Sequence, residues 1–388
     1  MLKREIGIGL VGYKFMGKAH TNGYRQLNMF MDPGARVRLK ILCGRDGDWL
    51  RKNARQFGFE GFETDWQALC RREDIDAVDI TTPSNFHADI AIAAAQSKKH
   101  VFCEKPMALT LADARQMLAA AEGSGVKHQV GFNYRFAPAV RLAKKLIDSG
   151  ALGTIYHFRA LYLQDWILDP SFPLVWRLDK KVCGSGSLGD LGAHIIDLGY
   201  HLVGEYKQVI GMEKTFIKQR PLVERMEGLS GAAGSDAPLG DVTVDDATVA
   251  LLEFENGAIG TVEATRFAAG HDNDMLFEIN GSKGSIRYRF ERMNELEFFS
   301  REDDRAVAGW RNIAATHSVH DYMPSWWPPG HVLGYEHTFT HELYEFVQAI
   351  AGNTDTCPSF CDGVKNAEVM EAVEQSIKNR CWVRIDEV

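Results

Sequence analysis

Long apolar runs, paired cysteines and an excess of positive charge are all missing from this sequence. No stretch of about 18 apolar residues occurs, so no segment is long enough to cross a bilayer as a helix. The formal net charge is -8, which argues against a nucleic-acid partner because such a partner requires a basic face. Residues 1–5 lead into a predicted strand without the apolar core of a signal peptide. We therefore predict no membrane or nucleic-acid partner and a cytoplasmic location.

The cysteines are few and scattered. The seven of them occupy positions 43, 70, 103, 183, 357, 361 and 381, and no two form a C-x-x-C pair. An odd, dispersed set is a poor framework for disulfides and is typical of a chain kept reduced. Cys357 and Cys361 could clamp a metal ion, but no cluster of His or Cys accompanies them. We therefore predict no metal site.

The first third of the chain alternates short apolar runs with helical patterns. The predicted strands are 6–11, 38–43, 77–81 and 100–103. The first predicted helix starts at about residue 17, and two further helices are predicted at 49–57 and 87–95. This alternation indicates a doubly wound parallel sheet built from right-handed crossovers. At 388 residues the chain also exceeds what one hydrophobic core usually serves, so we expect two domains.

After Gly131 the pattern changes to strands joined by hairpin turns. The predicted strands are 153–163, 247–255, 258–265, 275–280, 285–289 and 295–300. Asn256–Gly257 and Gly281–Gly284 are typical hairpin turns, so we predict an antiparallel sheet. The low-complexity stretch 227–240 is predicted to be a mobile surface loop. Helices are predicted near 337–351 and 363–378.

A glycine-bearing turn, Gly12–Gly17, joins the first predicted strand to the first helix. The first glycine is expected to make the tight turn of a dinucleotide site and the last to allow close helix–sheet packing. The helix N-terminus would then face the pyrophosphate. Lys14 replaces the usual middle glycine and could supply a cation to the phosphates or point to solvent. A plain strand–helix turn is the alternative interpretation.

The end of the second predicted strand bears on the choice between NAD and NADP. A dinucleotide fold usually has an acid there for the ribose 2′-hydroxyl, but Gly44 holds that place and Arg45 follows it. Arg45 would suit a 2′-phosphate or could be a solvated surface charge. Asp46 could still act as the acid if the strand is offset. The sequence leaves both cofactors open and leans toward NADP or dual use.

Two further motifs carry groups suited to hydride-transfer chemistry. Cys103–Pro106 follows a strand at the carboxyl edge of the predicted sheet, where ligands bind, and it contains Lys105. Downstream of a glycine-rich stretch, Asp190, His194 and Asp197 fall at helical spacing and are predicted to share one helix face. A histidine can exchange a hydroxyl proton, a carboxylate can orient it, and a lysine can stabilise a developing alkoxide. Each motif alone could instead be a surface lysine or a packed histidine.

With these motifs in this order, the chain resembles the Gfo/Idh/MocA oxidoreductases nearly end to end. The resemblance rests on the glycine turn with His20 after it, Thr82–His87, Glu104–Pro106, Asn133–Arg135 and Asp190-x-x-x-His194. It implies an α/β fold with an N-terminal Rossmann domain and a C-terminal α/β domain that has a large, mostly antiparallel open sheet. We assign residues 1–130 to dinucleotide binding and 131–388 to substrate binding and oligomerisation. The C-terminal tail could pack back on the first domain.

The resemblance also implies roles for individual residues. Lys105, Asp190 and His194 would be the catalytic set. In it, His194 acts as acid/base, Asp190 orients it or relays its proton, and Lys105 polarises the substrate oxygen. The residues expected to bind NAD or NADP are Gly12, Lys14, Phe15, Met16, Gly44, Arg45, Thr82, Pro83, Asn85, His87, Glu104 and Lys105. The resemblance further implies a homodimer or homotetramer.

Within the family, Tyr162–Trp166 and Trp176–Arg177 look most like the glycoside 3-dehydrogenase branch that includes levoglucosan dehydrogenase. The residues expected to bind substrate are Asn133, Tyr134, Arg135, Gln164, Trp166, Arg177, Asp190 and His194. An aromatic face can pack on a pyranose while amide and guanidinium groups read its hydroxyls, although buried tryptophans are more often core residues.

The predicted function is NAD(P)-dependent oxidation of a ring hydroxyl of a sugar or glycoside, at C3, to a ketone by hydride transfer. An inositol dehydrogenase or a keto-sugar reductase is the alternative within enzymes. The alternative of another class is a catalytically silent regulator that binds a dinucleotide or a sugar. The co-occurrence of Lys105, Asp190 and His194 argues against that regulator, because a sensor has no need for a proton relay.

Overall fold

The computed structural model describes residues 4–222, 225–227, 230–232, 234 and 237–388. The chain divides into two compact units. The first contains the chain up to Asn133 together with Tyr335–Ala367, and the second contains Tyr134–Gly334 together with Glu368–Val388. Among the helices of the described residues, none combines the length and the apolar character that crossing a membrane requires.

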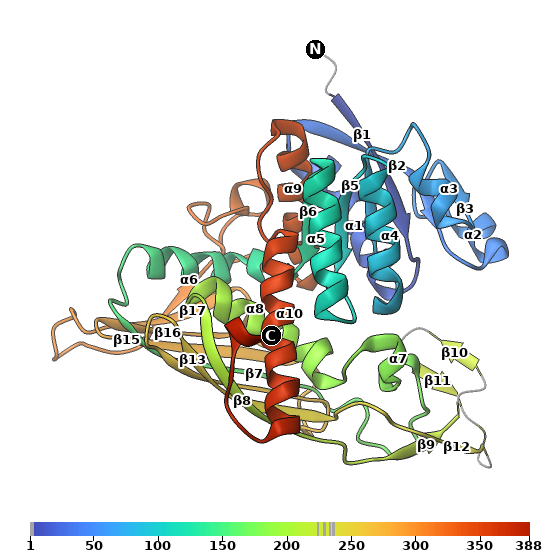
Figure 1. The fold of residues 1–388 in the computed structure, drawn as a ribbon. Coiled ribbons are helices and arrows are strands. Elements are labelled where there is room, and N and C mark those ends of the chain that lie inside the picture. Colours follow the sequence, from blue (N-terminus) through green and yellow to red (C-terminus); the bar gives the residue numbers. More distant parts are fainter. Residues whose placement is uncertain (1–3, 223–224, 228–229, 233, 235–236) are drawn as a thin grey trace. The chain divides into compact units, whose positions relative to one another are not determined.

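The first unit is built on a six-stranded parallel sheet with the strand order β3-β2-β1-β4-β5-β6 (Figure 1). Its strands are β1 (Arg4–Val11), β2 (Ala35–Cys43), β3 (Gly61–Glu63), β4 (Ala77–Ile80), β5 (His100–Glu104) and β6 (His128–Gly131). Ile6, Ile8 and Leu10 of β1 are fully buried, as expected for a parallel sheet that has helices on both faces. The predicted doubly wound sheet is confirmed.

The helices of the first unit come from both ends of the chain. They are α1 (Phe15–Phe30), α2 (Gly47–Asn53), α3 (Trp66–Cys70), α4 (His87–Gln96), α5 (Leu111–Ser124) and α9 (Tyr335–Gly352). Leu343 and Phe346 of α9 belong to the same hydrophobic core as β1, so this late helix is part of the unit. Helix α1 begins earlier than predicted and α2 ends earlier. Strands β3 and β6 and helices α3 and α5 were not predicted.

The second unit holds a nine-stranded sheet with the order β18-β17-β16-β15-β7-β14-β13-β8-β19. The strands are β7 (Ile155–Leu163), β8 (Tyr206–Lys214), β13 (Ala247–Phe254), β14 (Ile259–Thr265), β15 (Asp274–Gly281), β16 (Gly284–Arg289), β17 (Glu295–Ser300), β18 (Arg311–Ala314) and β19 (Val383–Arg384). The pairs are antiparallel except β7 with β14. This confirms the predicted large, mostly antiparallel sheet, although β8, β18 and β19 were not predicted.

Part of this sheet exposes apolar side chains. Burial alternates along β13, where Ala250 and Leu252 are buried while Val249 and Leu251 are exposed. Met212 of β8, which pairs with Val249, is also exposed. Helices α6 (Pro138–Asp148) and α8 (Ala193–Leu202) contact other strands of the sheet. Helix α10 (Phe360–Asn379) follows α9 in the chain. Its residues up to Ala367 belong to the first unit, and those from Glu368 onward belong to the second.

The predicted surface loop 227–240 lies partly outside the described residues, which omit 228–229, 233 and 235–236. The described residues there belong largely to short strands. Strand β10 (Arg225–Glu227) pairs with β11 (Ser230–Ala232), and β12 (Leu239–Asp241) pairs with β9 (Gln219–Pro221). Within 227–240, the prediction of a loop is wrong for Glu227, Ser230–Ala232 and Leu239–Gly240, which pair as strands.

Candidate active site

The turn between β1 and α1 has the backbone that a dinucleotide site requires. Gly12 has a φ of +111°, and a Cβ at this position would lie 2.6 Å from the Thr81 hydroxyl. Lys14 is the N-cap of α1 and makes no side-chain capping hydrogen bond. The first-turn amides, among them those of Phe15 and Met16, therefore point to an anion or to water. These residues fit the pyrophosphate of a dinucleotide, which supports but does not test their predicted role.

Aromatic side chains pack against the backbone at the end of β2. A Cβ on Gly44 would lie 2.2 Å from the Tyr13 ring, so an acid could not stand there without displacing that ring. Tyr13 in turn stacks on Trp49 with 4.5 Å between the ring centroids. Asp46 accepts a hydrogen bond from the Trp49 amide at 2.9 Å and thereby caps α2. Arg45 lies 6.0 Å from the Phe86 ring.

His87 joins the loop after β4 to the loop after β5. Its Nδ1 lies 3.0 Å from the Pro106 carbonyl oxygen, and its Nε2 lies 2.9 Å from that of Thr82. Burial lowers the pKa of this imidazole. His87 thus organises both the Thr82–Asn85 segment, which includes Pro83, and the backbone beside Lys105. Its direct contact with the cofactor stays a prediction.

Two other residues with predicted ligand roles are buried in the first unit. The carboxylate of Glu104 is 2.9 Å from His20, and only 4% of the residue is exposed. Asn133 is 3% exposed and donates a hydrogen bond to the Thr338 hydroxyl at 2.8 Å. Both side chains therefore already have partners within this unit, and their roles toward cofactor and substrate remain predictions.

Asp190 lies on a π-helical turn, η4 (Leu188–Gly192), that leads into α8. The sequence predicted Asp190, His194 and Asp197 on one face of a helix; His194 and Asp197 do lie on α8, whereas Asp190 lies on the π turn before it, so the spacing between Asp190 and the other two is not that of an α-helix. Turns of this kind are rare and recur at functional sites. Each of the three side chains has a different set of contacts.

Asp245 holds the start of this segment in place. Its carboxylate accepts hydrogen bonds from the backbone amides of Gly186 at 2.6 Å and Leu188 at 2.9 Å. It also accepts from the hydroxyls of Ser187 at 2.5 Å and Thr248 at 2.9 Å. Asp245 is 5% exposed. Since buried acceptors of charge-assisted bonds are strong restraints, Asp245 positions the turn that carries Asp190.

Arg266, just after β14, binds the predicted catalytic carboxylate. Its guanidinium is fully buried and donates to Asp190 Oδ2 at 2.9 Å. Further donors reach the carbonyl oxygens of Gly186 at 3.2 Å and Arg177 at 3.3 Å. A buried guanidinium that donates to a carboxylate oxygen restrains the orientation of that carboxylate.

His194 packs against tyrosine rings in the second unit. Its ring centroid lies 4.6 Å from that of Tyr134 and 5.9 Å from that of Tyr162. The hydroxyls of these tyrosines are 2.6 Å apart. His194 is 7% exposed, so the two rings leave little of its imidazole in contact with solvent.

A chain of hydrogen bonds links this aromatic wall to the predicted sugar-binding residues. Asn273 Oδ1 accepts from the Tyr162 hydroxyl at 2.9 Å and from the Gln164 amide at 2.7 Å. The indole of Trp166 donates to Gln164 Oε1 at 2.9 Å, and Arg266 lies 5.5 Å from the Trp166 ring. Gln164 and Trp166 are thus brought together with the surroundings of both Asp190 and His194.

Two predicted substrate-binding arginines have structural partners. Arg135 forms a bidentate ion pair with Asp197, with distances of 2.7 and 2.5 Å, and both side chains are 2% exposed. Arg177 places its guanidinium 4.2 Å from the Trp176 ring centroid, and burial lowers its pKa. Arg135 is engaged by Asp197, while Arg177 lies next to the Asp190–Arg266 pair.

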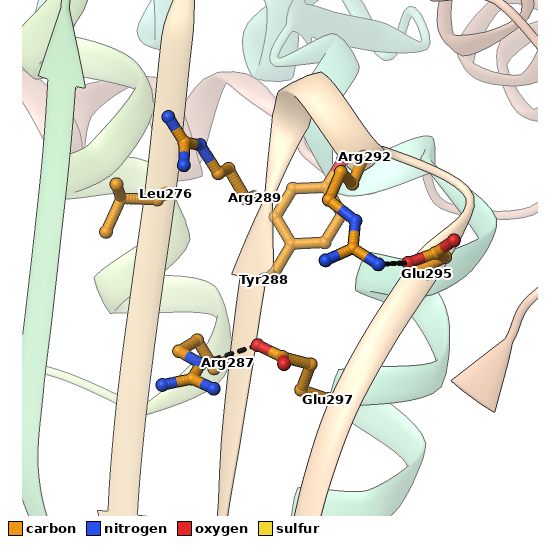
Figure 2. A pocket seen from close by; sticks show the side chains of 7 residues that line it. All are labelled: Leu276, Arg287, Tyr288, Arg289, Arg292, Glu295 and Glu297. Carbon is orange, nitrogen blue, oxygen red and sulfur yellow. Dashed lines mark hydrogen bonds and ion pairs between the residues drawn. The ribbon is translucent and has the colours of Figure 1, made fainter. Parts of the chain in front are cut away.

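A surface pocket lies apart from these residues, on the strands β15 to β17 and the turn after β16 (Figure 2). Its volume is about 320 Å³, and it is lined by Leu276, Arg287, Tyr288, Arg289, Arg292, Glu295 and Glu297. Ion pairs join Arg287 to Glu297 and Arg292 to Glu295. None of the residues predicted to bind cofactor or substrate lines this pocket.

Three residues of the site were missed by sequence reasoning: Arg266, Asn273 and Asp245. Arg266 directly follows the predicted strand 258–265 and Asp245 lies two residues before the predicted strand 247–255, so a charged residue near a strand end was the available signal. Asn273 had no such signal, because its importance comes from accepting two hydrogen bonds across the fold.

Comparison with models of known protein families identifies the family of this chain. Residues 6–132 match the oxidoreductase family with the NAD-binding Rossmann fold, and residues 140–287 match the GFO/IDH/MocA C-terminal domain. This chain belongs to the GFO/IDH/MocA oxidoreductase family, and it is an oxidoreductase with an NAD-binding Rossmann domain.

The relatives narrow the comparison further. Levoglucosan dehydrogenase of Pseudarthrobacter phenanthrenivorans is 40% identical over 388 residues, which is 99% of each chain. The crystal structure of an oxidoreductase domain protein from Kribbella flavida is 48% identical, with a TM-score of 0.93 over 98% of this chain and 99% of that one. A structure of levoglucosan dehydrogenase in complex with NADH and levoglucosan is 40% identical, with a TM-score of 0.92 over 98% and 100%. The resemblance predicted from the sequence is confirmed.

Proposed function

We propose that this chain is an NAD-dependent dehydrogenase that oxidises a ring hydroxyl of a sugar or glycoside, at C3, to a ketone. The hydrogen-bond chain from Trp166 through Gln164 and Asn273 to the tyrosines around His194 carries the proposal. Through this chain, Gln164 and Trp166, whose side chains are suited to binding a sugar, are connected within one unit to the surroundings of His194, the acid/base candidate. Similarity to a levoglucosan dehydrogenase supports the same substrate class.

The proposed cofactor is NAD. The turn at Gly12 and the uncapped N-terminus of α1 fit a pyrophosphate, and a structure of the related levoglucosan dehydrogenase contains NADH. Gly12, Lys14, Phe15 and Met16 would hold the phosphates. The bound dinucleotide supplies the hydride acceptor for alcohol oxidation. Arg45 is the residue through which NADP could also be used, because a guanidinium suits a 2′-phosphate.

In the proposed mechanism, His194 takes the proton from the substrate hydroxyl as the C–H hydride leaves the same carbon. Asp190, held by Arg266, orients His194 or relays its proton. Lys105 stabilises the negative charge that develops on the substrate oxygen. Gln164 binds sugar hydroxyls and Trp166 packs against the ring.

We also propose that the enzyme is a homodimer or homotetramer that buries the apolar face of β8, β13 and β14. Met212, Val249, Leu251 and Ile259 are exposed on these strands, and such patches mark protein interfaces. Light scattering after size-exclusion chromatography tests this, since Leu251→Glu should break the oligomer and so lower the molar mass of the particle in solution.

The cysteines bear on the proposed location. The buried thiols of Cys43, Cys70, Cys103 and Cys183 support a reducing, cytoplasmic location.

The test of function is absorbance of reduced nicotinamide, measured with purified protein, a panel of glycosides and inositols, and NAD and NADP in parallel. We expect turnover of a glycoside with NAD, and loss of turnover in both Lys105→Ala and His194→Ala. Turnover of inositols alone would favour an inositol dehydrogenase. Dinucleotide binding without turnover of any substrate would favour a silent regulator. Turnover retained in either variant would contradict the proposed proton path.

A further inference from the structure

A buried cluster of ionisable side chains adjoins Lys105 in the first unit. Helix α1 supplies His20, β4 supplies Asp79, the end of β5 supplies Glu104, and α9 supplies Glu342. Three of the four residues are 0% exposed and Glu104 is 4% exposed. The mechanism proposed above uses none of these groups, and burying so much charge is costly unless the groups are paired.

His20 lies between two carboxylates. Its Nδ1 is 2.9 and 3.0 Å from the oxygens of Asp79, and its Nε2 is 2.9 Å from Glu104 Oε1. A carboxylate oxygen accepts hydrogen bonds, so two carboxyl groups facing the two ring nitrogens favour the imidazolium form of His20, which donates from both nitrogens. Burial alone lowers the pKa of His20, but Asp79 and Glu104 together raise it well above its usual value.

Glu104 uses its two oxygens for two different partners. Oε1 accepts from His20, while Oε2 accepts from the backbone amide of Lys105 at 3.1 Å. One carboxylate therefore ties α1 to the peptide unit from which the Lys105 side chain extends. A charge-assisted hydrogen bond of this kind restrains orientation more strongly than a neutral one.

Glu342 is the fourth member of the cluster, and its surroundings favour its neutral form. Burial raises its pKa well above its usual value, and Glu104 and Asp79 raise it further while His20 opposes them. Neither of its carboxyl oxygens has a hydrogen-bond partner within the described part of the chain. One imidazolium and two carboxylates already leave one net negative charge, and a third buried carboxylate would add another.

We propose that His20 is a positioning residue for Lys105: its imidazolium fixes the Glu104 carboxylate, which in turn fixes the Lys105 backbone. Asp79 holds His20 from its other side. The inference rests on the proposed function, because it assumes that Lys105 acts on the substrate oxygen. The cluster would then affect catalysis by positioning Lys105, and this effect is separate from any contact of the cluster with cofactor or substrate.

A metal ion is the competing occupant of this cluster. His20, Glu104 and Glu342 each offer a ligand atom, and these atoms lie within 4.8 Å of one another. However, a ring nitrogen that donates to Glu104 has no lone pair left for a metal. We therefore assign a proton to His20 Nε2, and elemental analysis of the purified protein checks the choice.

The experiment compares His20→Gln, Glu104→Gln and Glu342→Gln with the wild type in steady-state kinetics. We expect the first two to lower kcat roughly 100-fold, because small misplacements of a catalytic group have effects of this size. KM for NAD should not change in His20→Gln, because His20 is not among the residues expected to bind the dinucleotide. Glu342→Gln has the shape of a neutral carboxyl and should keep the wild-type kcat. Thermal unfolding confirms that each variant is folded, and the isosteric Glu104→Gln keeps the test valid if His20→Gln does not fold.

Nitrogen-15 NMR of histidine-labelled protein gives a readout independent of activity. In the wild type, His20 should show two protonated ring nitrogens at pH 8, and in Glu104→Gln it should show a neutral ring. A neutral His20 in the wild type, a stoichiometric metal ion, wild-type kcat in His20→Gln, or equal loss of kcat in Glu342→Gln would each overturn the inference. A wild type that turns over no sugar contradicts the proposed function instead, while the NMR result still decides the charge of His20.

Discussion

Arg266 donates a hydrogen bond to Asp190 at 2.9 Å from a fully buried position. The two residues come from different elements, since Asp190 lies on the π turn before α8 and Arg266 follows β14. The pair occupies Oδ2 of the carboxylate and holds it next to Trp166, the indole over which Arg266 lies. In the proposed enzyme, Arg266 therefore links the orientation of Asp190 to the substrate pocket.

Replacing Arg266 should impair catalysis more than substrate binding. We expect Arg266→Gln to lower kcat roughly 100-fold, the scale of a lost contribution to proton transfer, because Asp190 loses its charged partner. Arg266→Lys keeps the charge and should recover part of the loss. Steady-state kinetics across the pH range measure both, and a wild-type kcat in Arg266→Gln would show that Asp190 does not depend on this pair.

Arg220 offers a matched control for that experiment. It is also fully buried in the second unit, but it donates to the backbone carbonyls of Ile167, Asp169 and Phe172. Arg220→Lys should lower the thermal unfolding temperature and leave the pH dependence of kcat unchanged. If both variants changed the pH dependence equally, general destabilisation would explain the effect of Arg266.

Asn273 is expected to govern affinity for the sugar. Its Oδ1 accepts from both Tyr162 and Gln164, so Asn273→Leu leaves the Gln164 amide without its orienting partner. We expect KM for the glycoside to rise about tenfold, the effect of losing about one hydrogen bond. Asn273→Asp still offers an acceptor oxygen and should behave nearly as the wild type. Equal KM values for the leucine variant and the wild type would contradict this role.

The parts of the fold that local pattern determines could be predicted. β1 and β13 were predicted because a fully apolar run and an alternating run each identify a strand by themselves. β3 and α3 are short and depend on pairing or packing for their stability, so their sequences carry little signal. Helix α9 was predicted as a helix, but its membership of the first unit depends on contacts with residues far away in the chain.

The site divides in the same way. Lys105, Asp190 and His194 were predicted from motifs and from a family resemblance, and their roles stay predictions, whereas Arg266 and Asn273 can be recognised only through tertiary contacts. The π turn was not predicted either, and the segment that leads into it is bonded to Asp245, a residue far away in the chain, at the amides of Gly186 and Leu188. Helical spacing in the sequence assumes a regular helix, and that assumption fails at this turn.

Removing Asp245 should destabilise the second unit. Asp245→Ala leaves the amides of Gly186 and Leu188 and the hydroxyl of Ser187 without their acceptor. We expect the free energy of unfolding to fall by about 3 kcal/mol, the range for buried hydrogen bonds to a charged group. Chemical denaturation measures this. Asp241→Ala is the control, because Asp241 is exposed and its carboxylate accepts a hydrogen bond from the exposed Gln219 side chain at 2.9 Å.

His201 should make the protein less stable in acid. Burial, together with the positive charges of Arg135, Lys144 and Arg141, lowers the pKa of this imidazole from 6.5 to about 2. Its Nε2 has no hydrogen-bond partner in the described part of the second unit. The unfolded chain therefore takes up a proton below pH 6.5 that the folded protein does not bind until much lower pH. Stability contributed by the neutral ring is present above pH 6.5 and is lost as the pH falls.

From pH 6.5 to pH 5 this group should reduce the free energy of unfolding by about 2 kcal/mol. His201→Gln cannot take up the proton, so its unfolding free energy should fall less over the same range, by that difference. Urea denaturation at several pH values measures both slopes, and His317→Gln, which replaces an exposed histidine, provides the matched control. Parallel slopes for His201→Gln and the wild type would mean that His201 is protonated equally in the folded and unfolded chains, and that its buried position does not exclude the charge.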